Sequence, residues 1–65
     1  MHVVEHVIVI RPEAFGVGFD VVVEPQPAWG NFGCERPDYR SAKRCADHIR
    51  IAHGWPIRDE TGAKA

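Results

Sequence analysis

The sequence predicts an α+β domain in which a small two- or three-stranded antiparallel sheet is covered by one C-terminal helix. Two runs rich in β-branched residues, at 3–10 and 17–24, predict strands, and a three- and four-residue apolar spacing at 38–53 predicts a helix. The 65 residues suffice for one domain. We expect that domain at 1–58, with a flexible C-terminal tail at 59–65, because the last residues are small and polar.

The first run, VVEHVIVI, favours a strand because β-branched side chains lose freedom in a helix and pack well on a pleated surface. Alternation places Val4, Ile8 and Ile10 on one face and Val7 and Val9 on the other. A strand that is apolar on both faces is either buried on both sides or covered by a partner. The run therefore raises the possibility of a homodimer formed through this strand.

The second run alternates most regularly, with Val17, Phe19, Val21 and Val23 on one face, and it predicts a half-buried strand. Pro12 and Gly16 precede it in a segment typical of a hairpin connection, since proline presets φ and glycine tolerates positive φ.

A third, weaker strand is expected at 29–35, with Phe32 and Cys34 directed inward. Gly30 and Gly33 weaken it, so whether it is a true strand stays open at this stage. Trp55, Pro56 and Ile57 are expected to form a last extended piece that covers an edge of the core.

The helix is expected from Asp38 to His53, capped by Asp38 or Ser41 and stopped by Gly54 and Pro56. Small and apolar residues share the side predicted to face the sheet: Ala42, Cys45, Ala46, Ile49 and Ala52.

The net charge is −1, but its distribution is uneven. Residues 1–35 hold one basic and five acidic residues, whereas residues 36–58 hold six basic and two acidic residues. The two halves either attract each other across the fold or present a basic face to a polyanion such as nucleic acid. The candidate contacts are Arg36, Arg40, Lys43, Arg44 and Arg50. Trp29, Phe32, Tyr39 and Trp55 are mostly core in one interpretation and a base-stacking platform in the other.

Cys34, Cys45, His48 and His53 are residue types that zinc prefers. Cys45 and His48 share a helical side and are the candidate metal ligands, but His53 is rotated away and Cys34 lacks a second ligand at short spacing. We expect no metal or other cofactor, and Cys45 as a buried structural residue.

Cys45 beside His48 also has the spacing of a thiolate–imidazole pair. No oxyanion arrangement accompanies the pair, and His2 and His6 have no partner carboxylate at a defined place. The expected catalytic set is therefore empty, and the chain is expected not to be an enzyme.

No secretory leader and no apolar run of membrane-spanning length is recognisable. We therefore expect a cytoplasmic protein without membrane contact, in which the two cysteines stay reduced and free.

Over residues 16–58 the order of elements, with Trp29 and Phe32 before Tyr39, Arg40, Ser41 and Ala42, resembles the short bacterial ββ(β)α domains of unknown function. Ala46, Ile49, Ala52 and Gly54 continue the pattern. The resemblance implies the same packing and carries over no catalytic residue.

The leading functional hypothesis is a small, non-enzymatic interaction module that binds a protein partner or a second copy of itself. A nucleic-acid-binding module that uses the basic helix face is less favoured, and a metal- or thiol-dependent protein that uses Cys45 and His48 is the third alternative.

Overall fold

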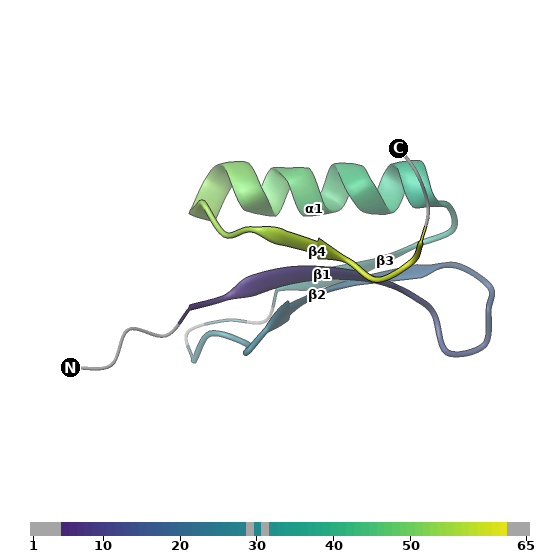
Figure 1. Cartoon of the computed structure of the whole chain (residues 1–65), viewed down its shortest axis with the longest axis horizontal. Coiled ribbons are helices and arrows are strands. Elements are labelled where there is room, and N and C mark those ends of the chain that lie inside the picture. The colour runs from purple at the N-terminus through teal and green to yellow at the C-terminus, as the bar shows by residue number, and fades with distance from the viewer. Residues whose placement is uncertain (1–4, 29, 31, 63–65) are drawn as a thin grey trace.

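The computed structural model describes residues 5–28, 30 and 32–62. Its elements are β1 (Val7–Pro12), β2 (Phe19–Glu24), β3 (Gly33–Arg36), α1 (Tyr39–His53) and β4 (Ile57–Asp59). The four strands form one mixed sheet in the order β3-β2-β1-β4, and α1 lies across one face of it (Figure 1). The α+β class is confirmed. The expected two- or three-stranded antiparallel sheet and the C-terminal position of the helix are corrected.

The correction comes from β4, which follows the helix and pairs with β1 in parallel, with Ile57 beside Ile8 and Asp59 beside Ile10. A strand of three residues is too short to show alternation in the sequence. The Glu60 N–H extends the contact by donating to the Ile10 carbonyl at 2.8 Å. The first residues of the expected tail at 59–65 therefore belong to the sheet.

β1 and β2 form the expected hairpin, but its connection lies at 13–18, two residues later than the sequence predicted. Val17 lies outside β2 and is 77% exposed, so its expected inward position is wrong. The Glu13 carboxylate accepts hydrogen bonds from the backbone N–H groups of Phe15 and Val17, and Gly16 adopts φ +76°. These local bonds give residues 13–18 a defined turn in place of strand pairing.

β3 is a true strand, paired antiparallel with β2 over four residues. Cys34 stands beside Val21 and packs against the core, as does Phe32, so both lie inward as expected. Trp29, where the predicted strand began, lies outside the described residues.

The core lies between α1 and the sheet face beneath it. Its buried members are Ile8, Ile10, Val21, Val23, Ala42 and Ala46. The two alanines face the strands and let the helix approach closely, which the small-residue pattern predicted. Ala52 is exposed instead, because it follows the exposed His48 by one turn and lies at the margin of the side that faces the core.

β1 is the central strand, which explains why it is apolar on both faces. Val9 is fully buried although its side chain projects from the face opposite α1. β2 pairs with one edge of β1 and β4 with the other, so its backbone offers no free edge to a second copy. The homodimer expected through this strand loses its structural basis.

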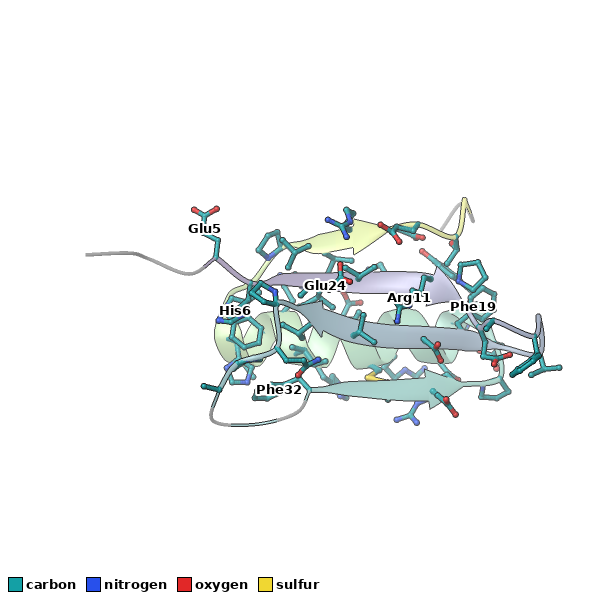
Figure 2. The ribbon with its side chains drawn as sticks, turned by 90° about the horizontal axis from the view of Figure 1, so that it is seen from below. Glu5, His6, Arg11, Phe19, Glu24 and Phe32 are labelled. Atoms are coloured by element: carbon teal, nitrogen blue, oxygen red, sulfur yellow. A yellow bond between two sulfur atoms is a disulfide. The ribbon has the colours of Figure 1, made fainter. Side chains whose placement is uncertain are left out.

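On the open face Val9 lies between its register partners, Val22 on β2 and Arg58 on β4. Glu24 on β2 and Arg58 on β4 form an ion pair at 2.7 Å that spans β1, and Arg11 approaches Glu24 at 3.9 Å. Figure 2 shows Glu24 and Arg11 on this face, with α1 behind the sheet. The stem of an arginine can shield apolar surface while its guanidinium stays in water.

Both helix ends are capped as the sequence predicted. The Asp38 carboxylate accepts from the backbone N–H of Ser41 at 2.8 Å, and Gly54 adopts φ 76° and donates to the Arg50 carbonyl. The Tyr39 hydroxyl donates to the Asp59 carboxylate, which ties the first turn of α1 to β4.

Cys34 and Cys45 are joined by a disulfide, so the expectation of free thiols is wrong. The inward position of Cys34 on β3 and the sheet-facing position of Cys45 on α1 bring the two sulfurs together. The bond ties the edge strand to the helix across a sequence separation of 11 residues.

We expect reduction of this disulfide to lower the free energy of unfolding by roughly 3 kcal/mol, because a closed loop of about this length removes that much unfolded-state entropy. Urea unfolding with and without a phosphine reductant measures the difference. A Cys34→Ala/Cys45→Ala double variant is the control, and its midpoint should not move with reductant. Equal midpoints for oxidised and reduced wild type would contradict the expectation.

We expect Arg58→Ala to destabilise the fold by about 1 kcal/mol, since it removes the ion pair with Glu24 and uncovers Val9. Arg50→Ala is the matched control, because Arg50 contacts Asp47 on its own helix and covers no core residue. Its cost should stay within about 0.5 kcal/mol in the same thermal unfolding experiment. Equal effects of the two variants would rule out the covering role of Arg58.

Candidate binding groove

A depression of about 250 Å³ lies between α1 and the edge strand β3. We call it the α1–β3 groove. Its lining consists of Arg36 from β3 with Ser41, Arg44, Cys45 and His48 from α1. Ser41 and His48 are each separated by three or four positions from the neighbouring residues Arg44 and Cys45, so the four border one side of α1. None of the described residues that line the groove is acidic.

The groove brings together members of two sets that the sequence kept apart. Arg36 and Arg44 come from the proposed nucleic-acid contacts, and Cys45 and His48 come from the proposed metal or thiol pair. The Arg44 and His48 side chains have no hydrogen-bond or ion-pair partner among the described residues. The groove therefore holds cationic and hydrogen-bonding groups that are available to a ligand.

The other predicted basic contacts are not in this groove. Lys43 contacts the Asp47 carboxylate at 2.9 Å, and Arg50 approaches the same carboxylate at 3.8 Å. Arg40 is exposed on the outer side of α1, and its side chain has no ion-pair partner in the part of the chain that the structure describes. The predicted basic face is thus divided, with Asp47 neutralising one part of it.

The structure removes the basis for a metal site at Cys45 and His48. The sulfur of Cys45 is bonded to Cys34 and is not available as a thiolate ligand. Across residues 5–28, 30 and 32–62, no three His, Cys, Asp or Glu side chains are grouped to hold an ion. The same bond means that Cys45 is not a free nucleophile.

The described aromatic residues do not form a stacking platform beside the groove. Trp55 packs against Phe32 at a ring distance of 5.5 Å and stacks on His53 at 4.4 Å, at the C-terminal end of α1. His6 contacts Trp55 as well, with a ring distance of 4.8 Å. Tyr39 meets Phe19 edge to face at 5.9 Å against the core.

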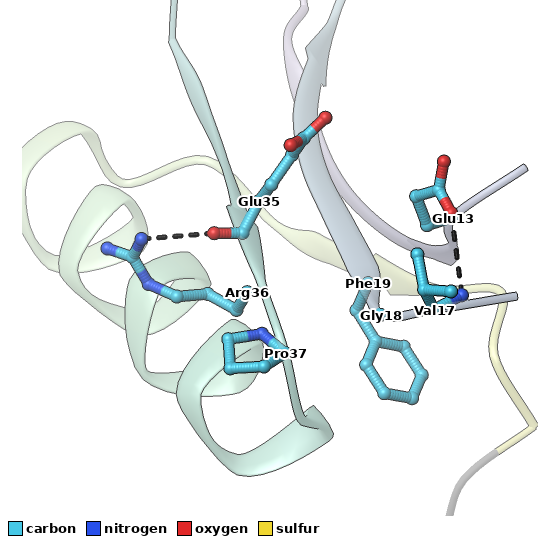
Figure 3. Close-up of a pocket in the computed structure, with 7 residues that line it drawn as sticks. All are labelled: Glu13, Val17, Gly18, Phe19, Glu35, Arg36 and Pro37. Carbon is cyan, nitrogen blue, oxygen red and sulfur yellow. Dashed lines mark hydrogen bonds between the residues drawn. The ribbon is translucent and has the colours of Figure 1, made fainter. Parts of the chain in front are cut away.

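A second depression, of about 280 Å³, lies at the base of the β1–β2 turn (Figure 3). Its polar groups already hold the local backbone. The Glu13 carboxylate accepts from Val17, and the Arg36 guanidinium donates to the Glu35 carbonyl at 3.1 Å. This depression mixes both charge signs and is a weaker candidate for a charged ligand.

β3 is an edge of the sheet next to the α1–β3 groove. Figure 3 shows the Glu35 carbonyl oxygen directed away from β2, toward the side of the Arg36 guanidinium. An edge strand presents unpaired backbone groups to which another strand can add. The free backbone edge and the basic groove are therefore neighbours.

Two features of this site were not predicted from the sequence. Ser41 was considered only as a helix cap, although its spacing from Cys45 and His48 already placed the three on one side of the helix. The edge position of β3 depends on strand order, and no local pattern in the sequence specifies that order.

The Asp38 carboxyl lies near the start of the groove, and nearby positive charges affect its pKa. The backbone N–H of Ser41 is the largest influence and holds the pKa of Asp38 below its ordinary value of 3.8, against an opposing effect of desolvation. The positive charges of Arg40 and Arg44 lower the pKa further.

No known protein family, curated protein or solved structure matches this chain. Within the described residues, no helix combines the length and the apolar character needed to cross a bilayer.

We expect the Asp38 cap to weaken at acid pH. The ionised carboxylate is favoured in the folded state, so its contribution is fully present above the unfolded pKa, near 3.8, and is lost as the pH falls through the lower folded value. Asp38→Asn keeps an acceptor that does not titrate. The difference in midpoint temperature between wild type and this variant should change below about pH 4 and stay constant from about pH 5 to 7. A constant difference at every pH would contradict the role of the charge.

Proposed function

We propose that this chain is a small protein-interaction module that binds an acidic, extended segment of a partner along the α1–β3 groove. The observation that carries the proposal is the position of the groove beside the free edge of β3. Backbone pairing with an edge strand supplies affinity, and the flanking groove selects the side chains. Acidic side chains on alternate positions of the added strand would face Arg36, Arg44 and His48.

The charges support an anionic partner. Guanidinium groups bind carboxylates through charge-assisted hydrogen bonds, and the Arg44 side chain has no competing ion pair among the described residues. His48 can donate a ring N–H to the same ligand. Arg36 would exchange its bond to the Glu35 carbonyl for a ligand carboxylate.

A protein segment is favoured over nucleic acid for two reasons. Sequence-independent nucleic-acid binding needs several phosphate contacts with aromatic rings beside them. Lys43 and Arg50 already share the Asp47 carboxylate, and the described aromatic rings lie at the C-terminal end of α1 or in the core. Single-stranded nucleic acid remains the second candidate, because Arg40 and Arg44 are unpaired within the described residues.

The test is titration of the oxidised protein with a peptide of alternating Glu and Val. We expect binding that weakens as salt rises, and Arg44→Gln should reduce the affinity on the order of fivefold, or about 1 kcal/mol. Arg50→Gln is the matched control on the same helix and should change the affinity less than about twofold.

Two further probes separate the alternatives. A peptide N-methylated at alternate backbone positions should bind weakly, because it cannot pair with β3. A peptide of alternating Lys and Val should not bind. Tighter binding of a single-stranded oligonucleotide than of the acidic peptide would favour nucleic acid as the partner. Equal binding of the peptide by wild type and Arg44→Gln would show that the groove is not the binding site.

A further inference from the structure

The disulfide borders the binding groove as well as the core. Cys45 lines the α1–β3 groove beside Arg44 and one turn from Ser41 and His48. Neither Cys34 nor Cys45 is among the fully buried residues. Of the two cysteines, only Cys45 is among the described residues that line the groove, so the Cys45 end of the bond is the one that a reagent in the groove would meet.

The groove also selects reagents by charge. Arg36 and Arg44 attract anions; Asp38 lies near the start of the groove, but its carboxylate caps α1 and is not among the described residues of the lining. Exchange starts when a thiolate attacks one sulfur of a disulfide, and the attacking species is itself negatively charged. A thiol that carries carboxylates is therefore concentrated next to Cys45, whereas a cationic thiol is repelled.

We propose that the Cys34–Cys45 disulfide is a redox-reversible site that is opened by anionic low-molecular-weight thiols bound in the α1–β3 groove. The proposal rests on the proposed function in one respect: both need the groove to attract anions.

The chemistry balances with two equivalents of the thiol. The first thiolate attacks the Cys45 sulfur, forms a mixed disulfide there and breaks the bond to Cys34, which leaves with the electron pair as a thiolate. A second thiolate attacks the sulfur of the bound thiol and releases Cys45 as a thiolate. The products are one external disulfide and two protein thiols, so two electrons pass from the thiols to the protein.

Neighbouring groups assist both steps. Arg44, which lines the groove together with Cys45, would stabilise negative charge that develops on the Cys45 sulfur in the second step. In the mixed disulfide the carboxylates of the bound thiol would lie among Arg36, Arg44 and His48. Opening the bond also releases the link between β3 and α1, which are the two walls of the groove.

The experiment compares glutathione, an anionic thiol, with cysteamine, a cationic thiol, on the oxidised full chain. Quenched aliquots are analysed by mass spectrometry, and each rate is divided by the rate of the same thiol with a small, uncharged disulfide. We expect the corrected rate with glutathione to be about tenfold higher than the corrected rate with cysteamine at low salt, and the two rates to become equal at about 0.5 M salt. A corrected ratio near unity at low salt would overturn the proposal.

Two variants and a mapping step make the test specific. Arg44→Gln should bring the corrected ratio toward unity, and Arg50→Gln, which lies outside the groove, should leave it unchanged. Trypsin cleaves at Arg40 and Arg44 and so separates the two cysteines, and the glutathione adduct should be on Cys45. An adduct found first on Cys34, or an unchanged ratio in Arg44→Gln, would refute the proposed geometry.

Failure of the redox proposal can be distinguished from failure of the proposed peptide binding. If the acidic peptide binds with the expected dependence on Arg44 but the thiols show no charge selectivity, only the redox proposal falls. If neither the peptide nor the thiols respond to Arg44, the groove is not an anion site and both proposals fall.

Discussion

β1 lies between β2 and β4, and this position determines how the two apolar faces of the strand are covered. A strand with apolar residues on both faces needs cover on both, and the chain supplies each by a different means. The helix buries Ile8 and Ile10 on one face. On the other face Val9 lies beneath an ion pair between Glu24 and Arg58 that crosses the strand. Surface ion pairs contribute little by their charge alone, so the packing of their aliphatic stems matters more here.

The same placement decides where a ligand can approach. β3 pairs only with β2 and is therefore an edge strand, and the Cys34–Cys45 bond joins α1 to that edge. Arg36 and Arg44, which line the groove, then lie beside the free backbone of β3, while Lys43 and Arg50 are held by Asp47. A binding surface and a covalent link thus share one side of α1, which is why the two proposals meet at the same groove.

The sequence predicted several residues of the candidate site, but it did not predict that they lie together. Arg36 and Arg44 were recognised as basic contacts, and Cys45 with His48 as a possible pair, but each pair came from a separate hypothesis. The sequence placed Cys34 inward on a strand and Cys45 on the sheet-facing side of the helix, so the geometry of their pairing was already present. Free thiols were nevertheless expected because a reducing environment was assumed, and the disulfide shows that this expectation was wrong.

Local patterns alone determined the alternation of β2, the limits and caps of α1 and its small sheet-facing residues, because periodicity and capping act over a few neighbouring positions. The strand order, the parallel pairing of β4 and the disulfide were decided only in the tertiary structure, since each joins segments that no local pattern relates. Val17 shows that a local pattern can also mislead. Its alternation fits a strand, yet it lies in the turn, where its backbone N–H donates to the Glu13 carboxylate. Longer-range pairing selected one arrangement among those that the local pattern of this chain allowed.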